Sequence, residues 1–259
     1  MPENDRVTAY VPASGPPELA AGLAELAGLL SAQPWRAGGP EGDPIALDAE
    51  TLAGYLTAVE TDWANGVPSP CLLASGDLVL VADFPPDGPA NVWFPLLSRP
   101  AIDGLLDLLG DVVTALGAYH AHVENDRLLM LYQAVRATER ARAAAPEEYR
   151  HLIPDPPGQA GSGAVPSLLV PQEYDTRRVP PGVWWANYWD ARQVRTLGEN
   201  RVHAARWARL RPAGQGLLLA PTEEPLDPSR ADHAALLREL VEGLGLPAAQ
   251  ERFRFGEDR

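Results

Sequence analysis

A tryptophan-rich stretch at residues 182–198, GVWWANYWDARQVRTLG, restricts the fold more than any other part of this 259-residue chain. Side chains alternate between the two faces of a strand, so Trp185 and Asn187 share one face if the stretch is extended. Trp184 and Tyr188 then share the other, and large rings occupy both faces. The pattern predicts a central strand covered on both sides, which belongs to the core rather than to a ligand site.

The residues around this strand carry local predictions. Asp190 is expected to cap a short helix that Gly198 ends. The polar Asn187 needs a partner in such a core, and we expect it to bond backbone across the strand–helix junction. A Trp185→Ala change is expected to lower stability by about 3–5 kcal/mol, as for other buried aromatic side chains.

Helical and strand-like patterns are mixed along the rest of the chain. Apolar residues at three- and four-residue spacing predict helices at 16–33, 48–66, 98–117, 126–150 and 227–245. Caps are expected at Asp48, Ser98 and Asp227. Strands are expected at 7–11, 77–84, 90–97, 118–124, 182–189, 201–210 and 216–222, and a loop at 36–44. This order predicts an α+β fold in which several amphipathic helices pack on a mainly antiparallel sheet of hairpins.

The chain is expected to form one α+β domain over 1–259, with a Pro/Gly-rich loop or hinge at 152–167. Its single cysteine, Cys71, cannot form an internal disulfide, which fits a reducing compartment. The first residues are polar and no apolar run reaches about 18 residues, so neither a signal peptide nor a transmembrane helix is expected. These features predict a cytoplasmic protein.

Acidic side chains are concentrated in the first half of the chain. Residues 1–125 hold 17 acidic residues and three arginines, whereas 126–259 hold 18 of each sign, so the net charge of −14 lies in the first half. Binding to nucleic acid or to an anionic membrane needs cationic side chains. A run of arginines around Trp207 has the composition of a nucleic-acid site, but acids are dispersed around it. The charge therefore favours a basic protein as the partner, and neither nucleic acid nor membrane.

No motif of a known catalytic class is found. The GQAGSG segment follows prolines rather than a strand, and no G-x-S-x-G nucleophile elbow occurs. Cys71 lies beside Leu72 and Leu73, which is typical of a buried thiol rather than of a nucleophile. No catalytic residue and no cofactor are therefore assigned.

Two patterns raise the question of metal binding. His120 and His122 stand two residues apart, which on a strand puts both imidazoles on one face, although spacing identifies no third ligand. Asp103, Asp107 and Asp111 recur every four residues, which is typical of the solvent face of a helix. The histidine pair is the basis of one alternative function, a metal-dependent enzyme.

The tryptophan-rich stretch resembles the C-terminal signature of bacterial immunity-type proteins, the immunity protein 52 group and the related type VI secretion (TsiV-like) immunity family. Such proteins carry a pattern like P-G-V-x-W-x-N/T-Y/F-L/W, then an aliphatic residue, a spacer and L-G. The matching positions are Pro181, Gly182, Val183, Trp185, Asn187, Tyr188, Trp189, Val194, Leu197 and Gly198. The resemblance covers residues 180–200 and extends loosely over 75–250.

Membership of this family implies a non-enzymatic α+β protein that binds and neutralises one cognate toxin, with no catalytic set or cofactor. A basic toxin would be attracted to the acidic half of the chain. The candidate partner-binding residues are its loop, turn and helix-start carboxylates, namely Glu41, Asp43, Asp48, Glu50, Asp83 and Asp87. Two alternatives stay open: the metal-dependent enzyme that uses His120 and His122, and a regulatory or scaffold module.

Overall fold

The computed structural model describes residues 5–12, 16–65, 70–84, 89–125, 128–129, 132, 165–166 and 168–256. The chain divides into two compact units, Asn4–His122 and Val123–Arg259. The prediction of one domain over 1–259 stays a prediction. Of the predicted loop or hinge at 152–167, only Val165 and Pro166 lie within the described residues.

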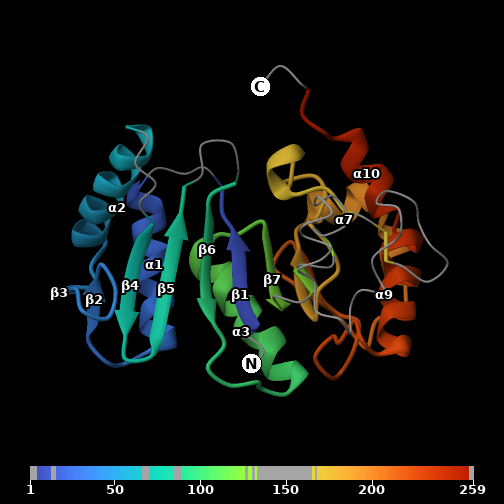
Figure 1. Ribbon diagram of the computed structural model, residues 1–259, viewed down its shortest axis with the longest axis horizontal. Helices are drawn as coiled ribbons and strands as arrows, with labels where there is room; N and C mark the ends of the chain where they lie inside the picture. Colours follow the sequence, from blue (N-terminus) through green and yellow to red (C-terminus); the bar gives the residue numbers. More distant parts are fainter. Residues whose placement is uncertain are drawn as a thin grey trace. The chain divides into compact units, whose positions relative to one another are not determined.

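The N-terminal unit is built on an antiparallel sheet (Figure 1). Six of its strands run in the order β3-β2-β4-β5-β6-β1, and each neighbouring pair is antiparallel. Their bounds are β1 Asp5–Tyr10, β2 Trp35–Ala37, β3 Asp43–Ile45, β4 Cys71–Ser75, β5 Leu78–Asp83 and β6 Asn91–Pro95. Strand β7, His120–Asn125, begins next to β1, where the Tyr119 N–H donates to the Tyr10 carbonyl at 3.1 Å.

Three helices provide the apolar core of this unit, α1 Pro16–Leu30, α2 Ala49–Ala64 and α3 Ile102–Leu116. Helix α1 packs on both α2 and α3, while α2 contacts β4 and α3 contacts β1. The leucines of α1 at helical spacing, Leu19, Leu23 and Leu26, are buried, as are most residues of the α3 stripe. Burial of these stripes against the strands stabilises the unit.

Helix α1 approaches α3 closely at a glycine. A Cβ added at Gly22 would lie 2.5 Å from the Ala115 carbonyl oxygen, whereas one added at Gly28 would meet nothing within 4 Å. We expect Gly22→Ala to lower the free energy of unfolding by about 1–3 kcal/mol, because the two helices must separate. Gly28→Ala is expected to raise it by about 0.5–1 kcal/mol through helix propensity. Urea unfolding of both variants measures this contrast, and equal effects would argue against the close α1–α3 approach.

In the C-terminal unit, three antiparallel strands are paired in the order β8-β10-β9. Its strands are β8 Ala186–Trp189, β9 Arg209–Ala213 and β10 Gly216–Ala220. Its helices are α7 Ala191–Leu197, α8 Glu199–Ala204, α9 Ala231–Gly243 and α10 Leu246–Arg252, with a 3-10 turn η1 at Pro171–Glu173. Helix α7 contacts β8, β10, α8 and α10, so it lies at the centre of the packing in this unit.

The α+β class with a mainly antiparallel sheet is confirmed, and so are several of its elements. The hairpin of β5 and β6, helix α3 with its left-handed C-cap at Gly117, and the strand β7 form as predicted. Asp190 caps α7, because its side chain accepts the Gln193 N–H at 2.8 Å. Most of the helix predicted at 126–150 lies outside the described residues.

Five local predictions are wrong, and the first three concern a loop and two helix caps. Residues 36–44 do not form a plain loop but contribute to the β2–β3 hairpin, whose turn uses positive φ at Gly38 and Gly39. Ser98 does not cap α3, since that helix begins at Ile102, beyond the reach of the Ser98 side chain as a cap. Asp227 does not cap α9, which begins at Ala231, and instead its carboxylate accepts the N–H and hydroxyl of Ser229.

The strand predicted at 182–189 is shorter in the structure, where only β8, Ala186–Trp189, pairs with a neighbouring strand and residues 182–185 do not. The Asn187 side chain accepts the Trp184 N–H at 2.9 Å and donates to the Trp184 carbonyl at 2.8 Å, which bends the chain ahead of β8. The first part of the strand predicted at 201–210 is helical instead. There the Gly198 carbonyl accepts the N–H groups of Arg201 and Val202 and starts α8.

Candidate functional site

The histidine pair of β7 is a buried contact. His120 and His122 are both fully buried, and His120 Nε2 lies 3.1 Å from His122 Nδ1. The Tyr10 ring contacts both imidazoles, with centroids 5.5 and 5.9 Å away. The two imidazoles lie on one face of the strand, as predicted. However, His120 Nε2 and His122 Nδ1 are within hydrogen-bond distance of each other. Within the described residues, no group of three or more His, Cys, Asp or Glu side chains is arranged to hold a metal ion.

Cys71 is buried in β4, as the sequence predicted. Burial raises the pKa of its thiol to about 12, and the nearby Asp83 carboxylate adds to this. A thiol of this kind stays protonated at neutral pH and is a poor nucleophile, because the thiolate is the reactive form. Cys71 therefore behaves as a small hydrophobic residue of the core.

Four of the predicted partner-binding carboxylates form the acidic cluster, defined here as Glu41, Asp43, Asp48 and Glu50. All four are exposed, between the β2–β3 turn and the first turn of α2. Asp48 also caps α2, because its carboxylate accepts the N–H and the hydroxyl of Thr51, both at 2.8 Å. The hydrogen bond from the Thr51 backbone N–H is the main cause of a lowered pKa of Asp48, and the bond from the Thr51 hydroxyl is the second.

The other two predicted carboxylates differ from this cluster. Asp83 lies at the end of β5, is half-buried, and accepts a hydrogen bond from Trp93 Nε1 at 3.3 Å. Burial raises its pKa, so this carboxylate is partly removed from solvent. Asp87 lies outside the described residues. The structure therefore places Asp83 in a structural contact with Trp93.

Each arginine of the N-terminal unit has an interaction within the unit. Arg6 lies over the Trp93 ring at 5.5 Å, Arg36 donates to the Gly42 carbonyl at 2.8 Å, and Arg99 pairs with the buried Asp5. Asp103, Asp107 and Asp111 are exposed on α3, as expected of its solvent face. Within the described residues, none of these arginines forms an ion pair with a carboxylate of the acidic cluster.

The family-marker residues form core and turn structure in the C-terminal unit. Trp185, Tyr188, Trp189 and Leu197 are buried, and Gly198 has a positive φ of 93° at the end of α7. The Asn187 side chain bonds the Trp184 backbone and also donates to the Leu219 carbonyl at 3.3 Å. Asn187 therefore bonds backbone, as predicted, but it bridges to β10 rather than across the junction with α7. These family-marker residues are Gly182, Trp185, Asn187, Tyr188, Trp189, Leu197 and Gly198.

Two buried amide side chains of this unit were not singled out from the sequence. Gln193 Nε2 donates to the Thr176 carbonyl at 2.8 Å. Gln250 accepts the Leu169 N–H at 2.8 Å and donates to the Pro180 carbonyl at 3.1 Å. Both fasten loop backbone to a helix. Nothing in the local pattern distinguishes them from surface glutamines, because their partners are distant in the sequence.

The basic run around Trp207 is tied into the same unit. The Trp207 ring packs edge-on against Trp189 at 5.6 Å, and its Nε1 donates to the Val202 carbonyl at 2.9 Å. Arg209 pairs with Glu223, and Arg201 donates to the Leu244 carbonyl. Trp207 thus contributes to packing rather than presenting a free ring for stacking. Among the helices of the described residues, none is both long and apolar enough to span a membrane.

Comparisons with known proteins give little further information. No protein-family model and no curated protein matches the chain. Among solved structures, Pseudomonas aeruginosa T6SS protein PA0821 is similar, with 14% sequence identity and a TM-score of 0.48. The match covers 93% of this chain and 73% of that one. Similarity at this level assigns neither a family nor a function, so the resemblance to immunity families remains an interpretation of the sequence.

Proposed function

We propose that this protein is a non-enzymatic, immunity-type protein that binds and neutralises a cognate basic toxin in the cytoplasm. The observation that carries the proposal is the separation of charge between the two units. The N-terminal unit, Asn4–His122, contains 15 acidic residues and three arginines, a net charge of −12 out of −14 for the chain. A cationic protein surface is the partner that this unit attracts most strongly.

The exposed carboxylates make the charge available to a partner. The acidic cluster and the carboxylates of α3 face solvent, and the three arginines have contacts inside the unit. Charge of one sign on a preformed surface steers a complementary partner and raises the association rate, often by tenfold or more at low salt. Fast capture suits an inhibitor that must leave almost no toxin free.

The candidate catalytic groups support a binding role more than a chemical one. The Cys71 thiol is buried with a raised pKa, and the facing nitrogens of His120 and His122 contact each other below the surface. A catalytic group must reach a substrate within hydrogen-bond distance. Cys71, His120 and His122 are buried away from any bound molecule, whereas the carboxylates of the acidic cluster are exposed and can contact a partner protein.

Reversing charge in the acidic cluster tests the proposal. In the triple variant Glu41→Arg, Asp43→Arg and Glu50→Arg, Asp48 is left in place because it caps α2. The binding partner to use is the purified product of the adjacent gene, because immunity proteins of the family that the sequence resembles are commonly encoded beside their toxin. Its association, followed by stopped flow, is expected to slow by about tenfold or more at low salt, and the salt dependence of the association rate is expected to fall.

A second triple variant provides the matched control. Glu25→Arg, Glu60→Arg and Asp62→Arg change the net charge equally at exposed positions of α1 and α2 outside the acidic cluster. A smaller effect than in the cluster variant is expected. Equal effects would show that only total charge matters, and unchanged kinetics in both variants would refute the electrostatic part of the proposal.

A further inference from the structure

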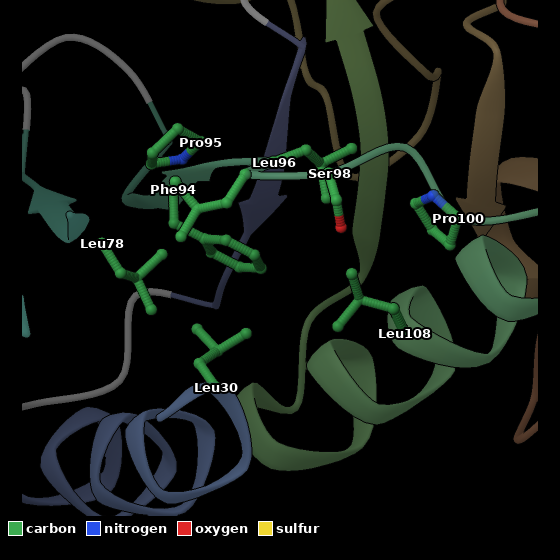
Figure 2. Close-up of a pocket in the computed structure, with 9 residues that line it drawn as sticks. Leu30, Leu78, Phe94, Pro95, Leu96, Ser98, Pro100 and Leu108 are labelled. Carbon is green, nitrogen blue, oxygen red and sulfur yellow. The ribbon is translucent and has the colours of Figure 1, made fainter. Parts of the chain in front are cut away.

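An open apolar groove lies on the N-terminal unit between its helices and the strand β6. Its volume is ≈ 180 Å³, and its lining includes Leu30 of α1, Leu78 of β5, Phe94 of β6 and Leu108 of α3, together with Leu97 from the segment after β6. Figure 2 shows the side chains of Leu30, Leu78 and Leu108 directed towards the Phe94 ring. Elements far apart in the sequence thus supply one hydrophobic hollow.

One of the leucines that line the groove is unusually exposed for an apolar side chain. Leu97 is 64% exposed and Leu29, in the last turn of α1, is 57% exposed, and these are the large hydrophobic side chains exposed within the described residues. Covering an exposed leucine beside a hydrophobic groove with a partner removes apolar surface from water and so favours binding. Leu29 does not line the groove, so the two leucines form a matched pair for experiment.

Two exposed carboxylates stand close to lining residues of the groove in the sequence. Asp111 is exposed one turn after Leu108 on α3, and Asp77 is exposed immediately before Leu78. The cation beside the groove in the sequence, Arg99, pairs with the buried Asp5. Together with the net charge of −12 on the N-terminal unit, these carboxylates favour an apolar side chain flanked by cations as the occupant.

The size of the hollow limits the apolar part of the occupant. A cavity of about 150 Å³ lined by Leu, Ile and Phe is large enough to bind benzene. A groove of ≈ 180 Å³ therefore fits one aromatic ring or one branched aliphatic side chain, not a whole helix face. A single buried anchor of this kind is how many protein interfaces obtain most of their affinity.

We propose that this groove receives one apolar anchor side chain from an arginine- or lysine-rich segment of the protein partner. This inference rests on the proposed function, because the partner is the basic toxin. A second copy of the chain is disfavoured as occupant by the charge of −12 on each N-terminal unit, and an anionic lipid surface is disfavoured by the same charge.

A synthetic peptide tests the groove without knowledge of the toxin. The probe is a fluorescein-labelled peptide with a central Leu-Leu pair between two Arg-Arg pairs, titrated with the full-length protein by fluorescence anisotropy. A second peptide carries Ser-Ser at the centre with the same charge. We expect the Leu-Leu peptide to bind at least about tenfold more tightly, the effect of burying one leucine side chain. Equal affinities, or no binding of either peptide, would overturn the proposal.

Two exposed leucines locate the binding. Leu97→Arg is expected to weaken binding of the Leu-Leu peptide by about tenfold or more, whereas Leu29→Arg, which adds the same charge, is expected to weaken it less than threefold. Circular dichroism checks that both variants are folded, as their exposure implies. Equal losses in the two variants would overturn the proposal. So would a wild-type dimer in sedimentation velocity that Leu97→Arg dissociates, because a second copy would then occupy the groove.

The same variant separates this inference from the proposed function. If the wild type neutralises the product of the adjacent gene and Leu97→Arg neutralises it equally well, the groove is not the anchor site, although the proposed function stands. If peptide binding behaves as expected but no neutralisation is observed, the proposed function fails. The groove then remains a binding site for a basic segment of another protein.

Discussion

Trp189→Ala is expected to lower the free energy of unfolding by about 3–5 kcal/mol, the range for deletion of a fully buried tryptophan. Trp189 is completely buried in β8 and packs edge-on against Trp207. Alanine would leave a cavity between the small sheet and its helices, and the contact with Trp207 would be lost. Urea unfolding followed by far-UV circular dichroism measures the change.

Phenylalanine provides the matched control at this position. The Trp189 Nε1 has no hydrogen-bond partner within the described part of the chain, so Trp189→Phe removes volume without breaking a hydrogen bond. We expect this variant to lose less than half of the stability lost by Trp189→Ala. Trp185→Ala, at a position that is also buried, is expected to fall in the same range of about 3–5 kcal/mol. A loss below about 1 kcal/mol in Trp189→Ala would mean that the tryptophan-rich segment is not the core of this unit.

Asn187→Ala is expected to lower the free energy of unfolding by about 2–4 kcal/mol, because it removes the hydrogen bonds that this side chain makes to buried backbone groups. The Asn187 side chain bonds both the N–H and the carbonyl of Trp184 and also the carbonyl of Leu219. Asn187→Ala therefore affects the bend ahead of β8 and the pairing of β8 with β10 together. Thermal and urea unfolding give the magnitude.

Aspartate separates the two roles of the Asn187 amide. Asn187→Asp keeps an oxygen that can accept the Trp184 N–H, but it removes the donor to the Trp184 and Leu219 carbonyls and places a carboxylate in the core. We expect this variant to be at least as destabilised as Asn187→Ala at neutral pH. A near-neutral effect of either variant would mean that these hydrogen bonds are replaced easily by water.

Local patterns predicted the parts of the fold that depend on residues near in sequence. The leucine spacing of α3 with Gly117 at its end, the cap of α7 at Asp190 and the placement of His120 and His122 on one strand face follow from periodicity and capping. Helix starts were predicted wrongly at α3 and α9, because the cap-type residues Ser98 and Asp227 stand ahead of these helices without capping them. The observed helices, which begin at Ile102 and Ala231, start four residues after Ser98 and Asp227.

Features that depend on distant partners were not predictable in this way. Asn187 bonds a residue 32 positions away and Gln250 one 81 positions away, so neither role is visible in a local window. The apolar groove is made by side chains of α1, β5, β6 and α3, none of which forms a motif by itself. The charge of each half could be predicted, because it is a sum over residues and does not depend on how the chain folds. The acidic N-terminal unit was therefore predictable, whereas its groove was not.

Growth of cells that co-express this protein with the product of the adjacent gene tests the central claim most directly. The neighbouring product alone is expected to arrest growth. Co-expression of the wild-type protein is expected to restore growth, and the triple variant Glu41→Arg, Asp43→Arg and Glu50→Arg is expected to restore it poorly at equal expression. If the neighbouring product arrests growth and folded wild-type protein does not relieve the arrest, or if that product is harmless, the account of this protein as a toxin neutraliser is contradicted.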